Sequence, residues 1–553
     1  MNENICITID EKHATFPMGT TVLEVLKNML PSHEVSTIFS TLWRGQILSL
    51  STELYKDATL SPLTYAHEES RRIYERTLRF VLLYAVKRLG LMQRVRILNS
   101  VSHGLYLRVT DTELTVETVH ALEEEMRKLV QLKLPIYREE YTKEEAIAYF
   151  DKQGWYEKAE LLRSSPKNRF TLYSLDGYKE FFYGDVLPHT GYVPTFSLKP
   201  HFPGLVMMFP TPQNPTFPAQ YSSRAKFLRV FSESQQWCEI LDAENACDVN
   251  RMVHQHNMQD FIRINEALHD RSIAVIADKI VRRKARVIMV FGPSCSGKTT
   301  FANRLAVHLR VLGFRPYMLS LDHFYRNRSE LPLEADGFPD LEHVDALDIP
   351  LFTTCIEELL AKREVEIPVF DFMTSSRCEK GTRVQLHDND PIIIEGIHGL
   401  NDKITACLPE QLMFGVYVSA LSCINLDEHN RIRTTDVRLI RRIVRDVQQR
   451  NTPVAETLRM WPNVRSGEER WIFPNQEKAD VMFNTSLHYE LPVLARIAID
   501  KLAEVNEDDT YYYVAQRLLN LLHYFVQVDD VTLAEIPTTS ILREFIGGNS
   551  FYN

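Results

Sequence analysis

The chain has 553 residues, several times the length of one ordinary domain, which predicts three or four folded units rather than a single core. Its 44% hydrophobic and 25% charged residues exclude the disordered and fibrous classes, and the formal charge of −10 argues against wholesale wrapping of nucleic acid. Eight scattered cysteines form no Cys-x-x-Cys pair and no zinc-finger grouping, which predicts reduced thiols. No segment is apolar enough over a sufficient length to cross a bilayer, and no signal-type segment opens the chain, so we expect a cytoplasmic protein.

The first 60 residues predict a small β-grasp unit. Residues 5–9 alternate as a strand does, and a second extended stretch covers 14–17. Thr20 or Thr21 can cap the apolar helical run that follows, and Pro31 ends it.

The next 160 residues predict a mixed α and β unit. Apolar spacing predicts a long amphipathic helix from about 68 to 90. A strand at 104–109, a helix over 115–132 and a helix opened by the capping pattern of Thr142 and Glu145 follow. Aromatic residues and prolines from 181 to 218 predict strands and loops, and residues 222–282 predict connecting helices.

A strand, a glycine-rich loop and a helix then follow one another. The apolar run 287–291 is typical of a buried parallel strand. It leads into Gly292-Pro293-Ser294-Cys295-Ser296-Gly297-Lys298-Thr299, the full G-x-x-x-x-G-K-[ST] pattern, and a helix continues from residue 300. An ordinary glycine turn is the alternative interpretation of this pattern.

This pattern predicts a binding site for the phosphates of ATP. Backbone N–H groups and the helix N-terminus would surround the phosphates, Lys298 would reach the β- and γ-phosphates, and Thr299 would bind Mg²⁺. The residues that we expect to contact ATP are Gly292, Ser294, Cys295, Ser296, Gly297, Lys298, Thr299 and Thr300.

Two further predicted strands, 317–321 and 391–394, each end in an acidic residue, Asp322 and Glu395. Ligands of parallel α/β folds bind at the carboxyl ends of the strands. Asp322 is therefore expected to act as general base towards an acceptor hydroxyl, or to orient that hydroxyl and hold Mg²⁺ through water. Glu395 is expected to serve Mg²⁺ as well. A simple helix cap is the alternative for Asp322.

A basic helix follows further along the chain. Several of its arginines fall on one face, and we predict that they clamp the transferring phosphate; they are Arg438, Arg441, Arg442, Arg445 and Arg450. A solvated basic helix face is the alternative.

Over about 200 residues the chain resembles the uridine/cytidine kinase and phosphoribulokinase family of P-loop kinases. Besides the loop, the matching segments are 320–325, 342–348, 368–372, 376–377, 394–397 and 436–446. The resemblance implies a catalytic role for Asp322, Mg²⁺ ligation by Thr299 and Glu395, and a lid that carries Arg438 and Arg441. The positions that it implies for acceptor binding are Tyr325, Glu342, His343, Phe370, Ser375 and Arg377.

The acceptor pocket departs from that family. Uridine kinases usually carry Tyr, His and Asp where this chain has Phe370, Ser375 and Glu342. Losing a hydroxyl and an imidazole removes hydrogen-bond partners that discriminate between bases. We expect phosphoryl transfer to be retained, and the departures leave the identity of the acceptor open.

The first 60 residues resemble a TGS domain, and the segment from Arg71 to about residue 200 resembles the editing region of threonyl-tRNA synthetases. The matching segments are 85–89, 134–140 and 188–192. The positions of the family's metal-type and catalytic residues hold Arg76, Phe80, Phe182 and Val186, so we expect neither deacylase activity nor zinc. This half could bind RNA, sense a small molecule or dock on the kinase.

Together these observations predict a multidomain α/β and α+β chain with a P-loop-type parallel sheet in its C-terminal half. The predicted units are a TGS-like β-grasp domain at 1–62, an editing-like α+β domain at 63–221, a helical connector at 222–285, a kinase domain at 286–500 and a helical tail at 501–553. The leading functional hypothesis is ATP- and Mg²⁺-dependent phosphorylation of a nucleoside-like acceptor. The alternative is a translation-linked, RNA-binding or regulatory NTPase. A homo-oligomer is left open.

Overall fold

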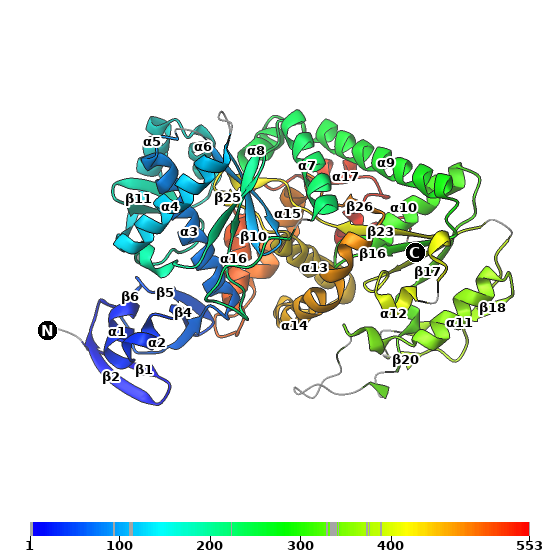
Figure 1. Cartoon of the computed structure of the whole chain (residues 1–553), viewed down its shortest axis with the longest axis horizontal. Helices are drawn as coiled ribbons and strands as arrows, with labels where there is room; N and C mark the ends of the chain where they lie inside the picture. The colour runs from blue at the N-terminus through cyan, green and yellow to red at the C-terminus, as the bar shows by residue number, and fades with distance from the viewer. Residues whose placement is uncertain are drawn as a thin grey trace.

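The computed structural model describes residues 4–551 except for 92–93, 110–113, 223, 328–329, 332–339, 341, 372–373, 375, 388–389 and 407. Two halves make up the chain. The N-terminal half carries several small sheets, and the C-terminal half is built on one larger sheet (Figure 1).

The C-terminal half contains a five-stranded, wholly parallel sheet, which confirms the predicted parallel architecture. The strands lie in the order β17-β22-β16-β23-β26, with bounds Tyr317–Ser320, Ile392–Gly396, Val287–Phe291, Met413–Ser419 and Val481–Asn484. Successive side chains of a strand point to opposite faces. Ile288 and Val290 accordingly join one hydrophobic cluster, and Val287, Met289 and Phe291 join another.

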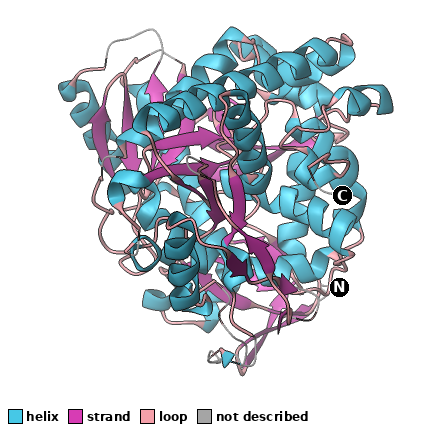
Figure 2. Ribbon diagram, turned by 90° about the vertical axis from the view of Figure 1, so that its right-hand side faces the viewer, coloured by secondary structure: helices cyan, strands magenta, loops and turns pink. Residues whose placement is uncertain are grey.

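Helices cover both faces of this sheet, as a parallel sheet requires (Figure 2). One cluster is shared with α9, α10, α13 and α15, and the other with α11. The helices of this half are α9 (Met258–Arg283), α10 (Lys298–Val311), α11 (Ile349–Leu360), α12 (Asp402–Thr405), α13 (Thr434–Arg450), α14 (Val454–Gly467), α15 (Glu490–Ala503), α16 (Tyr512–Leu522), α17 (Asp530–Glu535) and α18 (Arg543–Ile546).

The N-terminal unit consists of short strands around one capped helix. Strand β1 pairs antiparallel with β2 and parallel with β7, and β4 lies between β5 and β8. Thr21 and Glu24 form a complete capping box at the start of α1, so Thr21 is the cap of the predicted helix. The elements are β1 (Asn4–Ile9), β2 (Lys12–Pro17), β3 (Thr20–Thr21), α1 (Val22–Met29), α2 (Ser32–Val35), β4 (Ile38–Trp43), β5 (Gln46–Ser49), β6 (Glu53–Leu54), β7 (Ala58–Thr59) and β8 (Ser61–Thr64).

The second unit combines two antiparallel sheets, ordered β14-β15-β10-β9 and β11-β12-β13, with four helices. The predicted capping box of Thr142 and Glu145 is present at the start of α5. The elements are α3 (Glu68–Arg88), β9 (Val95–Val101), β10 (Gly104–Val109), α4 (Val116–Leu132), β11 (Ile136–Thr142), α5 (Lys143–Gln153), α6 (Tyr156–Ser164), β12 (Arg169–Leu175), β13 (Tyr178–Phe181), β14 (Ser197–His201) and β15 (Gly204–Met208).

Helix α3 differs from the amphipathic helix that its spacing predicts. Its polar side is also buried, and its arginines are at most 6% exposed at Arg72, Arg76 and Arg79. The reason is that the C-terminal half covers this side, since Arg72 binds Asp436 and Arg79 donates to the carbonyl of His429 at 2.6 Å. A local pattern cannot reveal a partner 350 residues away.

The two halves are joined by buried contacts. The hairpin of β24 (Asn425–Asp427) and β25 (Asn430–Arg431) bonds to β9, with Ile97 N–H donating to the Glu428 carbonyl at 2.9 Å. Lys158 and His429 both contact the carboxylate of Glu180, and all three side chains are at most 2% exposed. The connecting helices α7 (Ala225–Ile240) and α8 (Ala246–His254) complete the junction.

Asp436 at the start of α13 lies between two arginines from different parts of the chain. Its carboxylate is 2.9 Å from Arg72 of α3 and 2.6 Å from Arg517 of α16. Burial alone would raise the pKa of Asp436, but Arg517 and Arg72 outweigh burial and lower this pKa well below its ordinary value of 3.8.

Among the described residues, no helix combines the length and apolar composition needed to span a bilayer. The described cysteines are all free thiols.

Asp436→Asn is expected to lower the free energy of unfolding by about 3 kcal/mol, because two buried guanidiniums lose the acid that they share and keep only Glu68 and Glu69 as partners. Urea denaturation at pH 7 measures this loss. Because the folded pKa of Asp436 is depressed, its contribution is complete at neutral pH and disappears as the pH falls below about 4.

The matched control is Asp530→Asn, which removes the carboxylate of an ion pair with Arg496 whose acidic side chain is 86% exposed. It should change the free energy of unfolding by less than about 1 kcal/mol. Equal losses in the two variants would contradict the role assigned to Asp436.

Candidate active site

The loop between β16 and α10 is held close to the neighbouring strand. A Cβ atom at Gly292 would lie 1.9 Å from the carbonyl oxygen of Val418, so only glycine fits there. Gly297 precedes α10 with a φ of 82°, a conformation that favours glycine. These constraints turn the loop so that Lys298 and Thr299 begin the helix.

Lys298 and Ser296 lie within this loop and have few partners of their own. The Lys298 ammonium donates to the carbonyl of Pro293 at 3.1 Å. The hydroxyl of Ser296 is fully buried and has no hydrogen-bond partner among the described residues. Ser294 and Cys295 complete the loop, and Cys295 is buried. The loop therefore offers polar groups to a ligand.

The two acidic residues predicted at strand ends do lie beside this loop. Glu395 ends β22, which is paired with both β16 and β17. Its carboxylate accepts hydrogen bonds from Ser320 at 2.8 Å and from Thr299 at 3.4 Å. Asp322 follows two residues after β17 and lies half-buried near Lys298, whose charge acts on it.

The electrostatics of the two carboxylates are coupled. Burial raises the pKa of Asp322, and the nearby Lys298 ammonium opposes this rise. Burial and the charge of Asp322 raise the pKa of Glu395 to about 7. Two acids that repel each other beside a single ammonium would be stabilised by a cation.

The oxygen atoms of these residues suit a magnesium ion that binds together with a phosphate ligand. Two carboxylates and the Thr299 hydroxyl are oxygen donors, and Mg²⁺ usually takes only one or two carboxylates from a protein and completes its shell with phosphate and water. Within the described ranges, no group of three or more His, Cys, Asp or Glu side chains could hold a metal by itself.

The arginines of α13 have different surroundings. Arg438 donates to the Ser294 carbonyl at 3.1 Å and forms a buried pair with Glu468, and Arg442 reaches the Ser294 hydroxyl at 3.3 Å. Arg441 points elsewhere: it is fully buried and binds Glu490 at 2.7 Å and the Thr485 carbonyl at 2.9 Å. Arg438 and Arg442 therefore contact the loop directly. Arg441 instead binds Thr485 and Glu490, which follow β26 in the chain.

Three of the residues predicted to bind an acceptor lie near one another, with Tyr325 close to both Phe370 and Glu342 and within reach of the charge of Asp322. The rings of Tyr325 and Phe370 are 5.8 Å apart. The charges of Asp322 and Glu342, together with burial, raise the pKa of Tyr325 well above its ordinary value. Burial and the charge of Glu468 raise the pKa of Glu342 to about 7.

The remaining predicted acceptor residues have other surroundings. Arg377 is engaged by the chain itself, since it donates to the carbonyls of Tyr325 and Phe324 and binds Asp348 at 3.0 Å. The ring of His343 packs on Trp471 with centroids 4.5 Å apart. Ser375 lies outside the described residues.

The C-terminal segment reaches the loop, which sequence reasoning missed. The predicted helical tail at 501–553 is docked on the loop through its last residues. Glu544 accepts hydrogen bonds from the N–H and the hydroxyl of Thr300 at 3.1 and 2.8 Å, and Asn549 donates to the same hydroxyl. The fully buried Ile541 contacts Gly297. No local pattern marks these residues.

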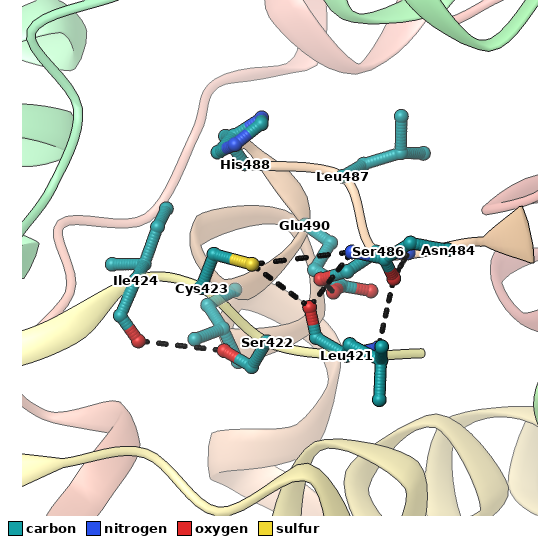
Figure 3. A pocket seen from close by; sticks show the side chains of 10 residues that line it. Leu421, Ser422, Cys423, Ile424, Asn484, Ser486, Leu487, His488 and Glu490 are labelled. Atoms are coloured by element: carbon teal, nitrogen blue, oxygen red, sulfur yellow. Dashed lines mark hydrogen bonds between the residues drawn. The ribbon is translucent and has the colours of Figure 1, made fainter. Parts of the chain in front are cut away.

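A small cavity near the ends of β23 and β26 is drawn in Figure 3. Asn484 bridges to both backbone groups of Leu421 there, and Ser486 donates to Glu490 at 2.6 Å. Its volume of about 10 Å³ holds at most one water molecule. Glu490, which accepts the hydrogen bond from Ser486, is also the partner of Arg441. The cavity is too small to receive a substrate.

In the N-terminal half, the positions that correspond to the editing residues do come together. Phe80 and Phe182 are in edge-to-face contact with centroids 5.6 Å apart, and Val186 is buried in the same cluster. Arg76 packs over the ring of Tyr183. Apolar packing occupies the region where those positions meet.

Comparisons with known proteins match the N-terminal and C-terminal parts of the chain to different proteins. Its N-terminal part is similar to the threonine–tRNA ligase of Symbiobacterium thermophilum, with 29% identity over 185 residues, which is 33% of this chain and 28% of that protein. A solved structure described as a possible uridine kinase from Bacillus stearothermophilus is 21% identical, covers 38% of this chain and 97% of that one, and has a TM-score of 0.27.

The similarity of the C-terminal half is more extensive. The uridine kinase of Bacillus pumilus is 30% identical over 203 residues, which is 36% of this chain and 87% of that protein. The family model described as "Phosphoribulokinase / Uridine kinase family" matches residues 287–490. Those residues contain the loop, both acids and the arginines of α13. The chain thus belongs, through its C-terminal half, to the phosphoribulokinase/uridine kinase family.

Proposed function

We propose that this chain transfers the γ-phosphoryl group of ATP to a hydroxyl of a nucleoside or a related sugar-containing molecule. The observation that carries this proposal is the meeting of Lys298, Thr299, Asp322 and Glu395 at adjacent strand ends. A nucleotide switch needs the lysine and the hydroxyl, but it does not need a carboxylate on the acceptor side.

The phosphate loop would bind the triphosphate. Lys298 would leave the Pro293 carbonyl and move to the β- and γ-phosphates, and the orphan hydroxyl of Ser296 would gain a partner. Thr299, Glu395 and Asp322 would hold Mg²⁺, which neutralises phosphate charge when it is bound. Arg438 and Arg442 contact Ser294 and would keep the loop in place.

Asp322 would take the proton of the attacking hydroxyl. Burial raises its pKa, which makes its carboxylate a stronger base than an exposed aspartate. The adjacent rings of Tyr325 and Phe370, which are tilted by 54° to each other, offer an aromatic wall, and Glu342 offers an acceptor for sugar hydroxyls. Positioning and charge neutralisation would supply most of the rate enhancement.

Asp322→Asn is expected to reduce kcat by about 10²–10⁴-fold, because it removes the general base, while the KM for ATP changes little. The assay incubates the protein with ATP, Mg²⁺ and a panel of nucleosides and pentoses, with Lys298→Ala as the blank.

The matched control is Asp402→Asn, in the same half, whose side chain is 86% exposed; it should leave kcat unchanged. If no nucleoside or pentose were phosphorylated, and slow ATP hydrolysis were indifferent to Asp322→Asn, a regulatory NTPase would replace the kinase proposal.

Glu544→Gln is expected to lower the KM for ATP about tenfold. The Glu544 carboxylate occupies the N–H and hydroxyl of Thr300, which the nucleotide's phosphates would use, and it adds a negative charge beside them. Initial rates at varied ATP concentration measure the effect. Glu535→Gln, in the same C-terminal segment but paired with Arg263, serves as the control. A rise in KM would mean that Glu544 supports nucleotide binding.

The KM for the acceptor is expected to fall as the pH rises from 6 to 8. Glu342 has a pKa raised to about 7, so its carboxylate, the better hydrogen-bond acceptor for hydroxyls, forms only above that pH. Glu342→Gln should abolish this pH dependence, and Glu358→Gln, whose carboxylate binds Arg363, should preserve it. An unchanged profile in Glu342→Gln would remove Glu342 from the acceptor site.

A further inference from the structure

A second and much larger cavity lies between the two halves of the chain. Its volume is about 1010 Å³, at the upper end of the range for small-molecule sites. Its walls come from α3, β9, α7, α13, α14 and α16, several of which meet in the middle of Figure 1. Pro212, Gln213 and Glu469 on its lining are exposed, so solvent can enter.

The lining is strongly basic. It contains eight arginines and four glutamates and no lysine or aspartate. Five of these arginines are already paired with acids: Arg72 and Arg517 share Asp436, Arg438 and Arg465 share Glu468, and Arg433 binds Glu75. The guanidinium of Arg224, by contrast, forms no hydrogen bond or ion pair within the part of the chain that the structure describes. An excess of guanidinium groups in a concave site is suited to phosphate.

Buried polar atoms on the lining are also without partners among the described residues. The Oδ1 atom of Asn99 and the Nε2 atom of Gln476 have no hydrogen bond, although the two residues are only 5% and 2% exposed. The Nε atom of Arg431, which is 7% exposed, has none either. A buried polar atom that stays unpaired destabilises the folded chain. A ligand with both donors and acceptors would satisfy them.

Aromatic side chains complete the chemistry of the cavity. Tyr417 and Trp461 are buried on its lining, at 2% and 8% exposure, and Phe473 and Tyr513 also line it. Flat rings beside arginines and unpaired amides are the groups that bind a base, while the guanidiniums bind its phosphates. Sugars or simple anions would leave either the charge or the rings unused.

This cavity is distinct from the proposed catalytic site but shares a wall with it. Lys298, Thr299, Asp322 and Glu395 do not line it. Pro293 and Arg438 do, and Arg438 also donates to the Ser294 carbonyl of the phosphate loop. A ligand bound in this cavity would contact both halves of the chain and Pro293 of the phosphate loop.

We propose that the cavity between the halves is a second binding site, which takes a nucleoside phosphate independently of the phosphate loop. Its arginines bind the phosphate groups, and its aromatic rings and the amides of Asn99 and Gln476 bind the base. The site needs both halves of the chain, so it gives the N-terminal half a role in ligand recognition.

The test is equilibrium dialysis of the full chain with the radiolabelled mono- and triphosphates of the four ribonucleosides. Lys298→Ala is used as the background, because it weakens the hold of the phosphate loop. At least one nucleotide is expected to bind one site per chain. Arg224→Gln should weaken that binding about tenfold, the effect of losing one charged hydrogen bond. Asn99→Asp should weaken it too, because the new charge repels phosphate.

The matched control is Arg229→Gln, on the same helix α7, where Arg229 is exposed and paired with Glu233. It should leave binding unchanged, and thermal unfolding of every variant checks the fold. Three results would overturn the proposal: no nucleotide binds, binding is indifferent to Arg224→Gln and Asn99→Asp, or only an oligoribonucleotide binds. Because dialysis reads binding and not turnover, a failure to phosphorylate nucleosides would leave this result intact.

Discussion

The way in which the two halves of the chain are held together depends on the carboxylate of Asp436. It stands at the start of α13 and is shared by Arg72 from the N-terminal half and Arg517 from the C-terminal segment. Removing charges from water is costly, and such a cluster is stable only when every charge has its partner. Asp436 and the two guanidiniums therefore hold α3, α13 and α16 together, with Glu68 and Glu69 of α3 as further partners of the arginines.

Helix α13 connects this cluster of charges to the phosphate loop. Within the next two turns after Asp436, Arg438 and Arg442 contact Ser294, and Arg441 packs on the ring of Phe545 in the C-terminal segment. The same helix thus touches the N-terminal half, the loop and the C-terminal segment. The N-terminal half is consequently part of the surroundings of the catalytic domain and not a tethered module.

Features encoded by neighbouring residues could be predicted from the sequence. The strand, loop and helix around Lys298 and the capping boxes at Thr21 and Thr142 depend on residues a few positions apart, and the structure contains them. The acids at the ends of β17 and β22 followed from the rule that ligand-binding groups gather at the carboxyl edge of a parallel sheet.

Features that depend on residues far away in the sequence could not be predicted. The burial of the polar side of α3 comes from contacts with residues 350 or more positions away. Arg441 resembles its neighbours in the sequence, but its partner Glu490 lies 49 positions on. The large cavity between the halves likewise exists only after both have folded.

The docking of the C-terminal segment also bears on the order of folding. Ile541 and Phe545 are fully buried, and Ile541 contacts Gly297 of the phosphate loop. Glu544 and its partner Thr300 are 244 positions apart, so a long stretch of chain must close before their hydrogen bonds can form. The packing around the loop is therefore expected to be completed late in folding, after the parallel sheet has formed.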